Sequence, residues 1–113
     1  MQRDDAYLLD ILLAARKVRA FVAGRSRRDF AFDEQLQLSV LHLIQIMGEA
    51  AGRVSAQTRD TLPGIPWASM VGMRNILVHR YWNIDLDRVW AAATISVIDL
   101  IAILGPVVPP DDP

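Results

Sequence analysis

Cysteine is absent from this 113-residue chain. Its absence excludes a disulfide scaffold, a thiolate metal site and a cysteine nucleophile, and it fits a reducing cellular interior. A strong charge of one sign is also missing, because 12 lysines and arginines face 13 aspartates and glutamates, a formal net charge of −1. A near-neutral protein has no general electrostatic grip on nucleic acid. Any contact with a polyanion therefore has to be local.

Apolar residues make up 52% of the chain, and the mean hydropathy is +0.22. A single domain this small has much surface for its volume, so surplus apolar side chains need cover from a membrane or a partner chain. Asp4, Asp5 and Asp10 interrupt the N-terminal apolar stretch and argue against a signal peptide. Asp99 interrupts residues 89–108 and would cost about 2.5–3.5 kcal/mol at a bilayer centre. We expect a cytoplasmic homodimer with no membrane partner.

Basic side chains gather at the end of the first predicted helix and in the loop after it. Half of the 12 basic residues lie there with no acid among them: Arg16, Lys17, Arg19, Arg25, Arg27 and Arg28. The segment is either a solvated helix end or a local patch that attracts phosphate. Arginine outnumbers lysine eleven to one in the chain. This ratio suits bidentate phosphate contacts, but genome composition also explains it.

The spacing of apolar residues predicts an all-α protein without strands or repeats. The first helix spans residues 5–22 and is closed by Gly24, a suitable C-cap. Its apolar stripe consists of Leu8, Ile11, Leu12, Ala15, Val18 and Phe21. The second helix begins after Asp33, a good N-cap, and continues toward Ser55. It is apolar around so much of its circumference that it must be covered on more than one side.

Two further helices complete the predicted fold. The prolines in segment 62–66 break the helical pattern. A third helix is predicted over residues 67–81 and a fourth over residues 86–104. Four helices with short links form an up-and-down bundle. We assign this bundle to residues 1–105 and a proline- and aspartate-rich tail to residues 106–113.

Polar residues interrupt the otherwise apolar third helix. Within residues 72–82 stand Arg74, Asn75, His79 and Arg80, followed by Tyr81. Buried or half-buried polar groups at this density are costly unless they are paired. One interpretation is a polar network, or a solvated edge, with only a structural role. The other is a catalytic site.

The pattern Arg74-x4-His79-x-Tyr81 resembles the signature of HEPN ribonucleases, in particular the HepT toxins that are paired with minimal nucleotidyltransferase antitoxins. The resemblance extends over nearly the whole chain. The other matching positions are Gly48-Glu49-Ala50-Ala51, Arg53, Ile65-Pro66-Trp67, Met73-Arg74-Asn75 and Asp85 to Trp90. The resemblance implies a homodimeric HEPN-like bundle that is an endoribonuclease toxin, with Arg74 and His79 as its catalytic residues.

The chemistry of RNA cleavage fits these residue types. RNA carries its own nucleophile, the 2′-OH, so cleavage needs no metal or cofactor, only proton transfer and a group that holds charge on the phosphate. His79 is the suitable proton carrier, and Arg74 can fork onto two phosphate oxygens. The expected products are a 2′,3′-cyclic phosphate and a 5′-hydroxyl.

Four other residues are assigned supporting roles. Asn75, one turn before the motif histidine, either orients the imidazole or the phosphate or is a simple surface amide. Glu49 pairs with Arg74 or Arg53, or faces solvent. Arg53 and Arg80 are expected to bind RNA.

The spacing of the motif points to a dimer. On an ideal helix Arg74 and His79 lie about 140° apart, so one copy makes an awkward site unless the helix loosens near His79. A two-fold dimer brings two copies together across a cleft. It also supplies two histidines, one as base and one as acid.

Tyr81, seven residues after Arg74, would share a helical face with it. It either packs in the core with its hydroxyl bonded, or presents that hydroxyl at the rim of the cleft. The resemblance implies that an MntA-like nucleotidyltransferase antitoxin adenylylates it. AMP there would put charge and bulk where the substrate phosphate sits.

The remaining histidine and the tryptophans are expected to be structural. His42 lies among apolar neighbours and is predicted to be a core or interface residue. Trp67, Trp82 and Trp90 are predicted anchors of the core or interface, with base stacking as an alternative for Trp82. Two rival functions remain: a non-catalytic HEPN module that assists a partner nucleotidyltransferase, and a purely structural dimeric bundle.

Overall fold

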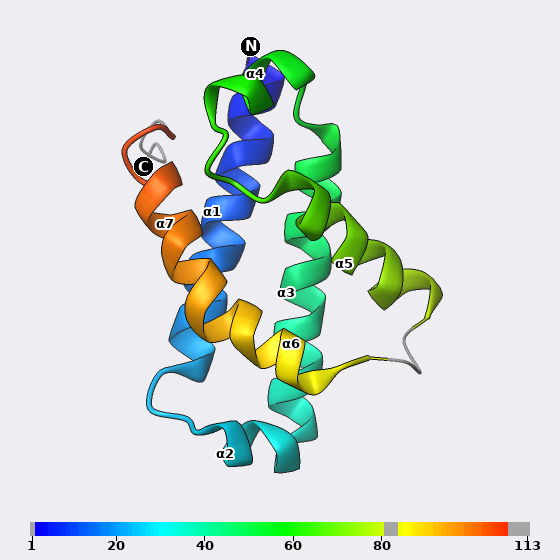
Figure 1. Ribbon diagram of the computed structural model, residues 1–113. Coiled ribbons are helices and arrows are strands. Elements are labelled where there is room, and N and C mark those ends of the chain that lie inside the picture. The colour runs from blue at the N-terminus through cyan, green and yellow to red at the C-terminus, as the bar shows by residue number, and fades with distance from the viewer. Residues whose placement is uncertain (1, 81–83, 109–113) are drawn as a thin grey trace.

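The chain folds as a helical bundle, shown in Figure 1 as a computed structural model that describes residues 2–80 and 84–108. Four long helical segments run alternately down and up. They are α1 (Gln2–Val22), α3 (Glu34–Arg53), α5 (Trp67–His79) and the segment formed by α6 (Leu86–Ala91), η2 (Ala92–Ser96) and α7 (Val97–Leu104). No strand occurs in the described residues. The predicted all-α bundle is confirmed.

The core lies around α1, which packs against both α3 and α7, and α5 packs on α3 (Figure 1). From α1 the core takes Leu8, Ile11, Leu12, Ala15 and Val18, as predicted. Phe21 was expected on the same stripe, but it is 45% exposed. Val22 is buried instead, since it lies four residues after Val18 and continues the stripe. Gly24 closes the helix with a φ of 73°, which confirms the predicted cap.

Two short helices escaped prediction from the sequence. They are α2 (Arg27–Phe32) and α4 (Ala56–Thr61), each of six residues. Helices this short cannot show a repeating apolar stripe, but both begin at a capping serine. Ser26 forms a capping box with Asp29, and Ser55 accepts a hydrogen bond from the Thr58 amide.

Asp4 ties the start of α1 to α4. The Asp4 residue is only 5% exposed. It accepts hydrogen bonds from the hydroxyls of Ser55 and Thr58, both at 2.6 Å, and from the Ser55 amide at 3.0 Å. These hydrogen bonds lower the pKa of Asp4, with the Ser55 hydroxyl contributing most.

The fourth predicted helix is present over its expected length, with one wide turn inside it. This turn is the π-helical η2, between α6 and α7. The Thr94 hydroxyl donates to the Trp90 carbonyl at 2.7 Å. Val108, in the segment assigned to the tail, is buried against the core. None of the described helices is long and apolar enough to cross a membrane.

His42 was predicted to be a core or interface residue, and the core assignment is wrong, since its side chain is exposed in the single chain. The interface assignment stays a prediction. His42 lies two residues from both Val40 and Ile44, which are buried. Two residues correspond to about 200° around a helix, so His42 is on the opposite side of α3. Leu38, one turn earlier, is exposed on the same side.

Candidate active site

Gly48 sets how closely α5 approaches α3. A Cβ atom at Gly48 would overlap the Cβ of Arg74 and would lie 2.7 Å from the Met70 carbonyl oxygen. Only glycine therefore permits this crossing. Gly52, one turn later, has room for a Cβ, whose nearest neighbour would be Val71 at 3.8 Å. The close contact at Gly48 places Arg74 directly against α3.

The guanidinium of Arg74 is held by two side chains. Its Nη2 lies 3.5 Å from Glu49 Oε1, and its Nη1 donates to Asn75 Oδ1 at 3.2 Å. Gln45 also donates to Glu49 Oε1, at 3.4 Å. The Nε of Arg74 is buried and finds no hydrogen-bond partner among the described residues. A buried donor without a partner costs about 1–3 kcal/mol, so this nitrogen of the guanidinium is held at an energetic cost.

A pocket of about 260 Å³ opens beside this arginine. Its lining consists of Gly48, Glu49, Gly52, Arg53, Val71, Arg74 and Asn75. Two arginines face one carboxylate, so the lining is cationic and suits a phosphate group. The structure thus brings together four of the residues chosen from the sequence. Glu49 was expected to pair with Arg74 or Arg53 or to face solvent, and in the structure it pairs with Arg74.

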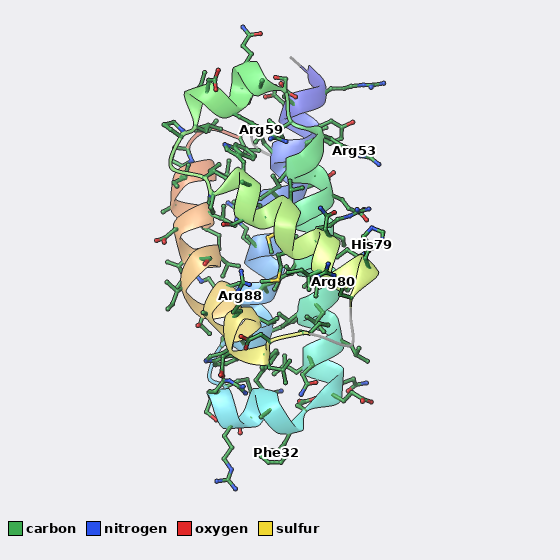
Figure 2. The ribbon with its side chains drawn as sticks, turned by 45° about the vertical axis from the view of Figure 1, so that its right-hand side comes forward. Phe32, Arg53, Arg59, His79, Arg80 and Arg88 are labelled. Carbon is green, nitrogen blue, oxygen red and sulfur yellow. The ribbon has the colours of Figure 1, made fainter. Side chains whose placement is uncertain are left out.

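His79 and Arg80 lie outside this pocket. His79 is the last residue of α5, and both side chains are exposed at its C-terminal end, away from Arg53 (Figure 2). The helix does not loosen before His79, so the angular separation from Arg74 remains. One chain alone does not bring His79 to the arginine pocket.

The third predicted helix ends earlier than expected, at His79. Arg80 leaves the helical conformation, with a φ of −140° and a ψ of 42°. Tyr81 and Trp82 lie outside the described residues, so the expectation that Tyr81 shares a helical face with Arg74 stays a prediction.

An apolar groove between α5 and the α6–α7 segment was not predicted. Its volume is about 280 Å³, and its lining includes Met47, Met70, Met73, Leu100 and the charged Arg88. Methionine is frequent on surfaces that adapt to a partner. The only sequence signal for this groove was that Met70 and Met73 stand close to the motif.

Comparison with known proteins identifies the family. A family model described as "Ribonuclease HepT-like" matches residues 11–107. The chain belongs to this HepT-like ribonuclease family. The resemblance seen at the motif and the predicted enzyme class, an endoribonuclease, are confirmed.

Individual HepT-like relatives agree with the family model. "Putative RNase MJ1380" of Methanocaldococcus jannaschii is 35% identical over 85 residues, which cover 75% of this chain and 78% of the relative. "Probable ribonuclease HepT" of Thermococcus cleftensis is 32% identical over 84 residues, which cover 74% and 76% of the two chains. No solved structure matches the chain.

Proposed function

We propose that this HepT-like ribonuclease is the toxin of a toxin–antitoxin pair and cleaves RNA in the cytoplasm without a metal or cofactor. The observation that carries the proposal is the environment of Arg74. Its guanidinium is fixed by Glu49 and Asn75 at the edge of a cationic pocket. A phosphate that binds there gains charge-assisted hydrogen bonds from donors that are already oriented.

In the proposed reaction the 2′-oxygen of the RNA attacks the adjacent phosphorus. One His79 removes the 2′-hydroxyl proton, and a second His79 donates a proton to the departing 5′-oxygen. Arg74 stabilises the additional negative charge on the phosphate oxygens. A P–O bond forms and another breaks, which leaves a 2′,3′-cyclic phosphate and a 5′-hydroxyl. Arg53 and Arg80 bind flanking phosphates.

A homodimer supplies the second histidine. The exposed position of His79, outside the pocket of Arg74, fits a site that two chains complete. Ile95 and Ile98 are large apolar side chains exposed on the α6–α7 segment, which also borders the apolar groove beside α5. This unpaired apolar surface favours association with a second copy.

The antitoxin is proposed to be an MntA-like nucleotidyltransferase that adenylylates Tyr81. Tyr81 follows His79 by two residues, so an added AMP would carry negative charge close to the site. It would compete with the RNA phosphate for the arginines.

Mixed dimers of wild-type and His79→Ala chains test the site shared between chains. The His79→Ala homodimer should not cleave RNA. A mixed dimer keeps both copies of Arg74 but only one of the two histidines that the proposed reaction needs. We expect the mixed dimer to be inactive as well, and we expect wild-type cleavage to persist in EDTA. A mixed dimer that retains cleavage would exclude a reaction that uses one histidine from each chain, and loss of wild-type activity in EDTA would exclude the metal-free reaction.

Intact-mass spectrometry tests the control by the antitoxin. Incubation with the cognate nucleotidyltransferase and ATP should add one or more AMP units to the wild type and suppress its cleavage of RNA. Tyr81→Phe should gain no AMP and stay active. An AMP adduct on Tyr81→Phe would assign the modification to another residue.

A further inference from the structure

The outer face of the second half of α1 carries three cations without neutralising acids. Arg16, Lys17 and Arg19 are all exposed. The ion pairs among the described residues are Arg25–Asp33, Arg27–Asp87 and Arg74–Glu49. No described carboxylate therefore lies within 4.0 Å of these three side chains. They remain available to an external anion.

The helix α2 adds another cation and an aromatic ring. Phe32 is 82% exposed, and the guanidinium of Arg28 lies 5.8 Å from the centre of its ring. Phe32 projects from the lower end of the molecule in Figure 2. Phe21, at the end of α1, is also exposed. Two of the three phenylalanines thus lie at the surface, and Phe32 lies beside Arg28, which forms no ion pair with a described residue. Exposed rings beside cations are typical of proteins that bind single-stranded nucleic acid.

The local charge differs from that of the whole chain. Residues 16–28 contain six basic residues and no acid, and the carboxylates of Asp33 and Asp87 neutralise two of the six. Asp29 lies next to Arg28 in the sequence, and its carboxylate accepts a hydrogen bond from the Ser26 amide, which lowers the pKa of Asp29 and keeps it ionised. Four of the six cations remain outside the ion pairs of the described residues, on a protein whose formal net charge is −1.

We propose that the basic surface, formed by Arg16, Lys17, Arg19, Arg28 and Phe32, binds single-stranded RNA. The cations bind phosphates and the ring of Phe32 stacks on a base. Because α3 lies between α1 and α5, the surface is separate from the pocket of Arg74 (Figure 1). It therefore holds a distant part of a long substrate. This inference rests on the proposed function, in which RNA is the substrate. Short RNA does not reach both places.

Binding of a fluorescent 2′-O-methyl 20-mer tests the surface without cleavage, because this probe lacks the nucleophilic hydroxyl. We expect the triple variant Arg16→Gln, Lys17→Gln, Arg19→Gln to lower the slope of log affinity against log salt by about 2, since each lost phosphate contact contributes about 0.7. Affinity at moderate salt should fall about tenfold. Phe32→Ser should weaken binding about five- to tenfold. Arg3→Gln, an exposed cation on the first turn of the same helix, is the matched control and should change nothing.

The cleavage assay separates this proposal from the proposed function. The triple variant should raise KM for a long RNA but cleave a trinucleotide at the wild-type rate. Unchanged affinity and salt slope would overturn the basic surface, even if the enzyme remains fully active. A wild type that binds the 20-mer through these residues but cleaves no RNA would overturn the proposed function and leave the basic surface standing.

Discussion

Two helices, α1 and α5, pack on α3 in different ways. The contact of α1 is a dense layer of apolar side chains, with Ile11, Ala15 and Val18 completely buried. Only Leu77 of α5 is buried, and the closest approach of that helix is the crossing at Gly48. Of these two helices, the candidate catalytic arginine is therefore on the one with fewer buried apolar residues. Stability and chemistry are largely carried by different sides of α3.

The largest effect on stability is expected at Phe30, on the packed side. Its side chain is completely buried, with its ring centre 5.2 Å from that of Trp90. Phe30→Ala should lower the free energy of unfolding by about 3–5 kcal/mol, because it leaves a cavity. Phe32→Ala, two residues later and exposed, should change it by about 0.5 kcal/mol or less. Urea denaturation of both variants measures the difference, and equal losses would contradict the assignment of the core.

Arg74→Ala should affect RNA cleavage much more than stability. Its ion pair with Glu49 is partly exposed, so the free energy of unfolding should change by about 1 kcal/mol or less. Cleavage of RNA should fall about 10²–10³-fold, because the phosphate loses a preorganised donor. Denaturation and single-turnover cleavage on the same sample test the separation. A variant that unfolds easily and keeps its rate would show that Arg74 is structural.

The crossing of α5 can be tested with two glycines in one helix. Gly48→Ala forces a Cβ into Met70 and Arg74, so we expect a loss of about 1–3 kcal/mol and weaker cleavage. Gly52→Ala meets only ordinary contacts and should be neutral or stabilise by about 0.5–1 kcal/mol, because alanine favours the helix. Thermal melting and cleavage rates distinguish the two. Similar behaviour would mean that the close approach does not matter.

The smallest expected effect is on the pH dependence of stability. The folded protein lowers the pKa of Asp4, so its contribution is fully present above the unfolded value near 3.9 and is lost as the pH falls through the folded pKa. Asp4→Asn should therefore be less stable than the wild type at pH 7, and the gap should narrow at pH 3. Asp5→Asn, an exposed neighbour, is the control. Urea titrations at both pH values measure the gap, and a gap independent of pH would contradict ionic stabilisation by Asp4.

Most of the long helices could be predicted because the spacing of apolar residues along the sequence shows the apolar stripe of an amphipathic helix. Errors occurred where the outcome depends on neighbours. Phe21 and Val22 both fit the stripe of α1, and packing selected Val22. His42 has apolar neighbours along the chain but lies on the outer side of the helix. The helix α2 is too short for periodicity and is held by Phe30, whose contact with Trp90 is distant in sequence.

The sequence alone determined the helical class, the cap at Gly24 and the motif that identifies the family, since each depends on residues within a few positions of one another. Only the tertiary structure decided that Glu49 meets Arg74 and that His79 stays outside their pocket. It also decided which of the clustered cations are paired and which remain available. These outcomes depend on how helices cross, and a helix crossing is set by packing between distant segments, as the close contact at Gly48 illustrates.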